Sequence, residues 1–235
     1  MLRARPLGEA DRILTLFTSE RGKLDAVAKG IRRARSHFAG RLEFANECEL
    51  QMHRGRSLDV IVSAEIHYAA WSRIVEPERY AVAAVVAELV DAFCEPDLAL
   101  PEVYALLMGA IRAISEMPGP RAVLPRFSLR LLDVLGLAPP LAACVRCGAP
   151  LASEIVWLDG EAGGVIDVAC RERWRDLPEL RPEDVANLRA LALPKSSGTA
   201  TLLATHAAAA AVEELIAHHL GKRPKAVAHL STLGA

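Results

Sequence analysis

The chain has 235 residues, of which 52% are apolar and 5% aromatic, and its formal net charge at pH 7 is −1. This apolar content is ample for a buried core and excludes a chain that is disordered throughout. No apolar run reaches the roughly 18 to 20 residues that a membrane span needs, and the N-terminus MLRARPLGEADR is too charged for a signal peptide. We therefore expect a cytoplasmic, soluble protein, and five irregularly placed cysteines fit a reducing compartment.

The first 65 or so residues have the patterns of a small antiparallel sheet. Two short apolar runs between Arg12 and Gly30 are joined by a polar turn at Gly22, which is typical of a β-hairpin. Alternating segments at 48–54 and 58–65 form a second pair around Gly55. A sheet this small leaves its edges exposed unless it closes, so the pattern favours a barrel.

The rest of the chain is predicted to be mostly helical. Residues 77–96 have apolar side chains at helical spacing, and a proline stands at each end. Further helices are expected at about 98–116, 121–135, 182–193 and 202–220. The fold class is therefore α+β, with a small β-barrel followed by helices.

Positive charge is concentrated near the N-terminus. The first 56 residues contain 12 Lys and Arg against 7 Asp and Glu, whereas the remaining 179 contain 16 against 22. Residues 26–42 include five basic side chains and no acid. Because phosphates are held by nearby Lys and Arg and not by overall charge, this segment indicates a local polyanion site. The alternative is a solvated surface without a partner.

The same segment includes Ser36, His37, Phe38 and Gly40. An aromatic or imidazole ring in it could stack on an unpaired base. Because aromatic residues are few, we expect contacts to the nucleic-acid backbone to dominate and sequence preference to be weak.

A second motif has the spacing of metal ligands. Cys144 and Cys147 are separated by two residues, so both thiolates can bind one Zn²⁺ from a tight turn. The expected second pair is Asp167 and Cys170, in which Asp takes the place of a cysteine. A Cys3Asp zinc site is chemically feasible, and a metal-free turn held by hydrogen bonds is the alternative. Neither a redox centre nor a catalytic zinc is favoured, and the usual nucleotide-binding and hydrolase motifs are absent.

These motifs occur together in one known family. The segment RPLGEADRILTLFTSERGKLDAVAKGIRRARSHFAG resembles the N-terminal signature of the bacterial DNA repair family RecO. The later segments RFSLRLLDVLGLAP, CVRCG, GGVIDVAC and HHLGKRPKAVAHLSTL follow in the order of that family. The resemblance covers nearly the whole chain, and its N-terminal blocks are far longer than a chance motif.

The resemblance implies a domain plan and a function. The plan is an OB-fold at residues 1–70 and a helical domain at 71–235, with a zinc-knuckle insertion at about 140–175. The implied function is a non-enzymatic recombination mediator that binds single- and double-stranded DNA and anneals complementary strands. With RecR, it would load RecA onto DNA coated by single-stranded DNA-binding protein. It would work in the cytoplasm, at the nucleoid when active.

The resemblance also assigns residues to these roles. The DNA-binding surface would comprise Arg12, Arg21, Lys23, Lys29, Arg32, Arg33, Arg35 and Arg41. The knuckle would comprise Cys144, Cys147, Asp167 and Cys170, holding one zinc ion. The acidic C-terminal tail of single-stranded DNA-binding protein would contact Arg126 or Arg130 in the helical domain.

Two other functions stay open at this point. One is a protein-interaction adaptor with incidental DNA affinity, and the other is a metal-dependent nuclease or hydrolase. The family usually has several residues before the point at which this chain begins, so we also expect a short first strand.

Overall fold

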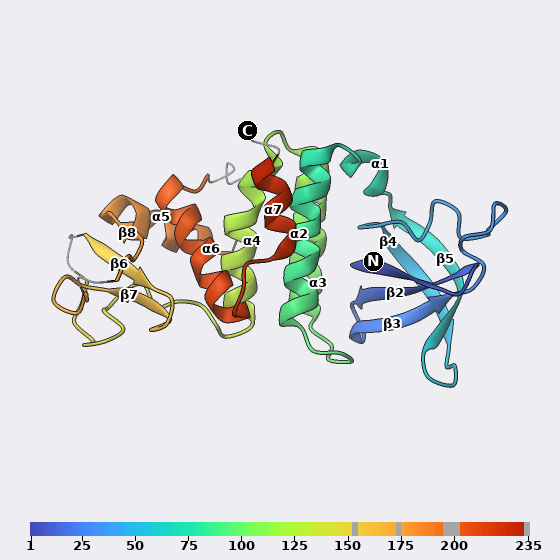
Figure 1. The fold of residues 1–235 in the computed structure, drawn as a ribbon, viewed down its shortest axis with the longest axis horizontal. Coiled ribbons are helices and arrows are strands. Elements are labelled where there is room, and N and C mark those ends of the chain that lie inside the picture. The colour runs from blue at the N-terminus through green and yellow to red at the C-terminus, as the bar shows by residue number, and fades with distance from the viewer. Residues whose placement is uncertain (152–154, 173–174, 195–202, 233–235) are drawn as a thin grey trace. The chain divides into compact units, whose positions relative to one another are not determined.

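The computed structural model describes residues 1–151, 155–172, 175–194 and 203–232. Two compact units are present (Figure 1). Unit 1 comprises Met1–Arg121 and the segment that begins at Lys225, and unit 2 comprises Ala122–Pro224. The helical region expected as one domain at 71–235 therefore contributes to both units, and the expected boundary at residue 70 lies inside unit 1.

Unit 1 begins with a five-stranded sheet. Its strands follow the order β1-β2-β3-β5-β4, and all neighbours are antiparallel except β3 and β5. Beside the start of β4, the Ala45 N–H donates to the Met1 carbonyl, which brings the two outer ends of the sheet together. This partly open five-stranded barrel confirms the predicted OB-fold. The strands are β1 (Arg3–Leu7), β2 (Asp11–Thr18), β3 (Gly22–Ala28), β4 (Glu47–His53) and β5 (Asp59–Tyr68).

The core of this sheet is formed by apolar residues at alternate positions, as the period of a strand requires. Leu14 and Leu16 on β2 and Leu24 on β3 are at most 5% exposed. Two further core residues, Phe38 and Leu42, come from the connection between β3 and β4. That connection is therefore anchored in the barrel and does not simply lie over its surface.

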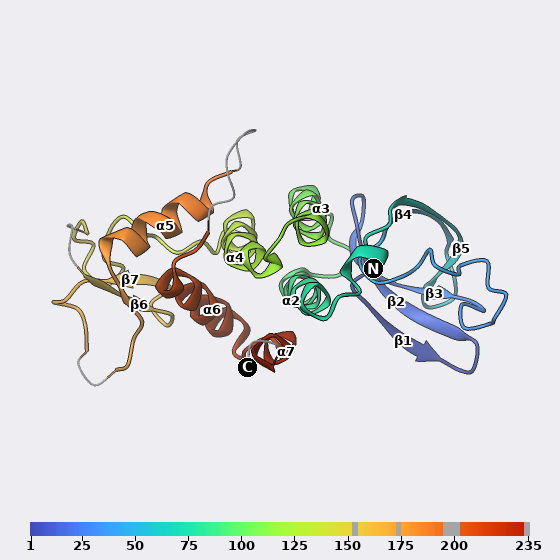
Figure 2. The ribbon, with the colours of Figure 1, turned by 90° about the horizontal axis from the view of Figure 1, so that it is seen from above.

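The helices of unit 1 pack beside one another. Helix α2 contacts both α3 and α7, and Figures 1 and 2 show α7 lying along α2. The Glu88 carboxylate on α2 accepts hydrogen bonds from the backbone N–H groups of Lys225 and Ala226, which caps the N-terminus of α7. The sequence predicted α2 and α3 but not α7. The helices are α1 (Trp71–Ile74), α2 (Pro77–Phe93), α3 (Pro101–Glu116) and α7 (Lys225–Thr232), and the 3-10 helix η1 spans Pro120–Ala122.

Specific contacts hold the sheet of unit 1 to these helices. Glu47 on β4 accepts hydrogen bonds from Tyr104 at 3.1 Å and from Arg112 at 2.9 Å, both on α3. Gly22, at the β2–β3 turn, has φ +66° and lies so close to Leu98 that a Cβ would be 1.8 Å from the Leu98 carbonyl oxygen. Only glycine fits at this turn, and the turn is consequently a junction inside unit 1.

In its described residues, unit 2 contains three helices, all in regions where the sequence predicted helices, and a small sheet that the sequence did not predict. The sheet has the order β7-β6-β8, with antiparallel neighbours. Among the described residues, no helix of either unit is long and apolar enough to cross a membrane. The elements of unit 2 are α4 (Val123–Val134), β6 (Val156–Asp159), β7 (Gly164–Ile166), β8 (Glu179–Leu180), α5 (Pro182–Ala192) and α6 (His206–Leu220).

Candidate nucleic-acid interface and metal centre

Residues 29–42 of the acid-free segment lie in the connection between β3 and β4. We call this connection, residues 29–46, the basic loop. Its backbone makes successive turns, in which the N–H groups of Arg33, Ser36 and Ala39 donate to carbonyls three residues earlier. Phe38 is 2% exposed and Leu42 is 4% exposed, and both pack in the barrel core. The loop is thus held by its apolar residues, while its charged residues point outward.

The cations of the basic loop have few partners within the protein. The side chains of Lys29, Arg33 and Arg35 are exposed and make no hydrogen bond or ion pair with any described residue. The Arg32 side chain lies 3.4 Å from the Gly8 carbonyl, and the Arg41 side chain donates to the His37 carbonyl. These groups are hydrated and uncompensated, which is the state that phosphate binding requires.

The cations at the β2–β3 turn are placed differently. Arg21 donates to Asp59 and, at 3.0 Å, to Asp97. These hydrogen bonds raise the pKa of Arg21 above its ordinary value. The Lys23 ammonium is half-buried and lies 3.5 Å from a carboxylate oxygen of Asp91. Both predicted DNA contacts are therefore engaged in holding unit 1 together.

The remaining predicted contacts have mixed outcomes. Arg12, on β2, is half-buried, and its side chain has no hydrogen bond or ion pair among the described residues. Phe38 cannot stack on a base, because it is buried in the core; that suggestion was wrong. His37 is exposed, with its ring centroid 3.8 Å from that of Phe38, so an imidazole ring stays at the surface of the loop.

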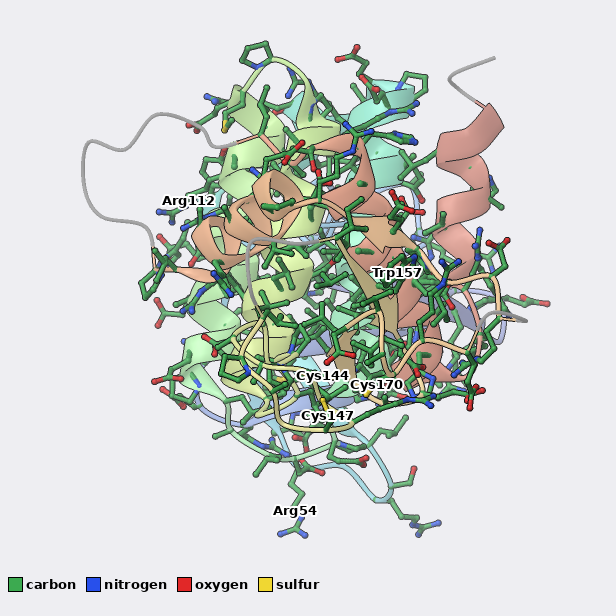
Figure 3. All side chains as sticks on the ribbon, turned by 90° about the vertical axis from the view of Figure 1, so that its left-hand side faces the viewer. Arg54, Arg112, Cys144, Cys147, Trp157 and Cys170 are labelled. Carbon is green, nitrogen blue, oxygen red and sulfur yellow. The ribbon has the colours of Figure 1, made fainter. Side chains whose placement is uncertain are left out.

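Sequence reasoning left two other exposed arginines out of the predicted DNA-binding surface. Arg54 and Arg56 flank Gly55 at the β4–β5 turn and make no hydrogen bond or ion pair among the described residues. Figure 3 shows Arg54 projecting away from the ribbon. The available signal was the acid-free run HRGRS across that turn. Loops at this position of OB-folds bind oligonucleotides, so the two arginines belong among the candidate contacts.

The four predicted metal ligands come together in unit 2. The sulfur atoms of Cys144, Cys147 and Cys170 and a carboxylate oxygen of Asp167 all lie within 4.8 Å of one another. Figure 3 shows the three cysteines gathered at one place. Two sulfur ligands of one zinc ion, each at about 2.3 Å, are at most about 4.6 Å apart, so small side-chain adjustments would suffice. The residues fit a metal ion, and the cluster could hold one.

The local hydrogen bonds show how this cluster is built. Gly148 has φ +75°, and its N–H donates to the Cys144 carbonyl, which closes the turn that brings the first two thiols together. The Cys147 thiol, at 3.1 Å, and the Cys170 N–H, at 2.8 Å, donate to Asp167. These bonds hold the pKa of Asp167 below its ordinary value, so it is a carboxylate ready to act as a ligand.

A buried carboxylate organises the residues around the cluster. Asp159, at the end of β6, has a side chain that is 0% exposed and forms ion pairs with Arg146 at 2.7 Å and Arg175 at 3.0 Å. Because Arg146 stands between the first two cysteines, this pair fixes the cysteine turn to the sheet. Trp157 packs with Cys144 and Ile166, and the Arg171 guanidinium lies 4.4 Å from the Trp157 ring centroid.

The two arginines predicted to bind a partner's acidic tail form hydrogen bonds inside unit 2. Arg126 donates to the carbonyls of Leu191 and Leu193, and Arg130 donates to the Ala192 carbonyl at 3.0 Å. These carbonyls lie at the C-terminal end of α5, where the backbone leaves acceptors unpaired and cations are favoured. Burial, and then the charge of Arg130, lower the pKa of Arg126. Their role in partner binding stays a prediction.

Comparison with known proteins decides the family. Residues 1–70 match the family model described as recombination protein O N terminal, and residues 75–228 match recombination protein O C terminal. The chain is also 36% identical over 195 residues to a protein named DNA repair protein RecO from Heliobacterium modesticaldum (strain ATCC 51547 / Ice1). The aligned part covers 81% of this chain and 71% of that relative. The chain belongs to the RecO family.

RecO is a family of DNA repair proteins. The two family models meet close to the end of the sheet, since the first ends at residue 70 and β5 ends at Tyr68. The metal-ligand cluster lies within the residues matched by the C-terminal model of RecO.

Proposed function

We propose that this RecO-family chain is a recombination mediator that binds single- and double-stranded DNA through the basic loop of its OB-fold. The observation that carries the proposal is the row of exposed cations at Lys29, Arg32, Arg33 and Arg35, which have no acidic partner among the described residues. Guanidinium groups bind phosphate in a bidentate manner, so such a row follows a nucleic-acid backbone without reading its sequence.

The same surface would also promote the annealing of complementary strands. Two complementary strands repel each other through their phosphates, and a protein that neutralises phosphates on each strand lowers that repulsion. Because the contacts are electrostatic and lie at an exposed loop, strands can slide and exchange while they search for their complement. The protein needs no bond-breaking chemistry for this work.

The mediator role extends beyond DNA binding. We propose that the chain acts with RecR to help load RecA onto DNA coated by single-stranded DNA-binding protein, in the cytoplasm at the nucleoid. The acidic C-terminal tail of single-stranded DNA-binding protein would be engaged by unit 2. If Arg126 or Arg130 takes part, the tail must compete with the carbonyl groups at the end of α5.

We also propose that Cys144, Cys147, Asp167 and Cys170 hold one zinc ion with a structural role. The hydrogen bond with Cys147, together with burial, raises the pKa of Cys170 to about 12 in the metal-free cluster. Zinc supplies the positive charge that stabilises the thiolates, and the ligands release protons when it binds. The bound ion would tie the cysteine turn to the segment after β7.

A salt-resolved binding and annealing assay tests this function. We expect the logarithm of the association constant for a single-stranded oligonucleotide to fall linearly with the logarithm of salt concentration. The slope should be about −0.7 for each phosphate neutralised, with several phosphates in all. Annealing of complementary strands should weaken over the same salt range. Salt-independent binding, or tight binding without annealing, would argue against the proposal and favour an adaptor.

A further inference from the structure

Three aromatic side chains gather at the surface of unit 1, beside the end of the basic loop. Phe44 belongs to the loop, Trp71 begins α1, and Tyr80 lies on α2. The ring centroids of Phe44 and Tyr80 are 5.4 Å apart, and those of Trp71 and Tyr80 are 6.1 Å apart with an interplanar angle of 80°. We call these three residues the aromatic cluster. In a chain with only 5% aromatic residues, such a gathering is a feature to be explained.

The cluster is partly open to solvent. Tyr80 is 46% exposed, and Phe44 and Trp71 are half-buried. The Tyr80 hydroxyl has no hydrogen bond to any described residue. Edge-to-face packing lets one ring support another while part of an aromatic surface stays uncovered. Val75, which lies between Trp71 and Tyr80 in the sequence, is another exposed apolar residue, at 57%.

A buried asparagine joins the aromatic cluster to the basic loop. Asn46 is 7% exposed, and its side-chain amide donates to the carbonyls of Gly40 and Arg41, both at 3.2 Å. Its side-chain oxygen accepts from the Trp71 backbone N–H at 2.9 Å. A single buried side chain therefore holds the Arg41 end of the loop and the start of α1 in a fixed relation.

The charges around the aromatic cluster are mixed. Arg41 and Arg73 are exposed, and Arg73 lies 3.5 Å from Glu116. Glu43 is half-buried and Glu76 is exposed, so the cluster itself is not a strong site for phosphate. A ligand that places its phosphates on the acid-free part of the loop and an uncharged aromatic group on the cluster matches this distribution.

We propose that Phe44, Trp71 and Tyr80 form a stacking platform for unpaired bases of a DNA strand whose phosphates lie on the basic loop. This proposal rests on the DNA-binding function proposed above and adds to it a source of preference for single strands. Bases in a duplex are stacked on one another and cannot reach the platform, whereas an unpaired base of any kind presents a flat aromatic face. The platform therefore favours single strands with little regard to sequence.

Substitutions at Tyr80 separate stacking from packing. Tyr80→Phe keeps the ring, whereas Tyr80→Leu keeps apolar bulk but removes the flat face. We expect Tyr80→Phe to bind an oligo-dT strand as the parent does, and Tyr80→Leu to bind it about tenfold more weakly. Affinity for a duplex of the same length should change by less than about twofold in both variants. Equal losses on the single strand and the duplex, or no loss on either, would overturn the platform.

A second measurement uses the unaltered chain, so it does not depend on the folding of a variant. Single-stranded oligonucleotides containing 5-iododeoxyuridine are irradiated in the complex, and the cross-linked peptides are identified by mass spectrometry. Cross-links at Phe44, Trp71 or Tyr80 are expected, because photocoupling requires a ring in contact with the base. Cross-links confined to other residues would overturn the proposal.

The two proposals fail in different ways. If the parent chain shows no salt-dependent DNA binding, the proposed function fails and the platform fails with it. If the parent binds DNA and loses binding on substitution of the basic loop, but Tyr80→Leu binds single strands normally, only the platform is overturned.

Discussion

The basic loop and the region around the metal-ligand cluster differ in whether their charged side chains have partners of opposite charge. On the loop, the side chains of Lys29, Arg33 and Arg35 share one sign of charge and form no hydrogen bond or ion pair with any described residue. In the cluster region, the buried Asp159 is compensated by Arg146 and Arg175. Unpartnered charge of one sign is suited to an external polyanion, whereas compensated charge serves the fold itself.

The same difference separates neighbouring residues within unit 1. Arg21 and Lys23 are close in sequence to the basic loop, but each is paired with aspartates on other elements. Basic composition alone thus overstates the size of the DNA surface. The candidate interface comprises the cations that have no acidic partner in the described part of the protein, and not every cation in this part of the sequence.

The largest expected effect concerns the anchor of the basic loop. Replacing Phe38 with Ala removes a side chain that is 2% exposed from the barrel core, and we expect the free energy of unfolding to fall by about 3 to 5 kcal/mol. Denaturant unfolding monitored by circular dichroism measures this. Ala39→Ser at the exposed neighbouring position is the control and should leave stability unchanged. A near-neutral Phe38→Ala would mean that the loop is not anchored in the core.

Zinc affinity should depend on how many of the four ligands are cysteines. Asp167→Cys restores a fourth sulfur, and we expect zinc affinity to rise by about tenfold or more, while Cys144→Ser should lower it by a similar factor. Competition with a chromophoric chelator measures both changes. If neither substitution alters zinc affinity, the cluster is a metal-free turn held by hydrogen bonds.

Acid should weaken unit 2 through Asp159. Burial raises the pKa of Asp159, but the hydrogen bond from Arg146, the Ala162 N–H and the charge of Arg175 outweigh it and hold the pKa below its ordinary value of 3.8. A lowered pKa means that the carboxylate stabilises the folded state above pH about 4 and that this contribution is lost as the pH falls through the folded-state pKa.

The variant Asp159→Asn separates this contribution from general acid unfolding. It should be less stable than the parent at pH 7, and the difference should shrink as the pH falls below about 4. Thermal unfolding across that range measures both chains. A constant difference at all pH values would show that Asp159 does not titrate as the structure implies.

The smallest expected effect is on the paired cation at the β2–β3 turn. Arg21→Ala should reduce the free energy of unfolding by less than about 1 kcal/mol, because the Arg21 side chain is 49% exposed and such ion pairs are weak in water. Its effect on DNA affinity should be smaller than that of Arg33→Ala. Binding assays on both single variants make the comparison, and a greater weakening by Arg21→Ala would reverse the assignment.

Much of this architecture could be predicted from local patterns. β2 and β3 are short apolar runs on either side of a polar turn, and β4 and β5 alternate apolar and polar residues. α2 and α3 have apolar residues at helical spacing and begin at prolines, so these signals are visible in the sequence. The strands β6, β7 and β8 were not predicted, because segments of four, three and two residues are too short to show a period. Instead, β6 and β7 pack around Trp157 and Ile166, and β8 pairs with β6.

The candidate site was predicted only in part, for a related reason. The spacing of the cysteines identifies the metal ligands, because those residues lie close together in the sequence. The partners of Arg21 are 38 and 76 residues away, so no local pattern could show that this arginine is neutralised. The aromatic cluster likewise combines residues 44, 71 and 80, which only the fold brings together.

The most direct test of the central claim compares two variants with the same change in charge. In one, Lys29, Arg32, Arg33 and Arg35 on the basic loop are all replaced by Ala. In the other, the acid-paired cations Arg3, Arg5, Arg21 and Lys23 are replaced by Ala. Both variants have four fewer positive charges than the parent, so long-range electrostatics change equally.

Affinity for a single-stranded oligonucleotide is measured for both variants over a range of salt concentrations. We predict that the loop variant binds at least about a hundredfold more weakly at low salt, and that its salt slope is shallower by roughly 0.7 for each phosphate that is no longer neutralised. The acid-paired variant should retain the slope of the parent. Equal weakening in the two variants, or a loop variant that binds and anneals DNA as the parent does, would contradict the account.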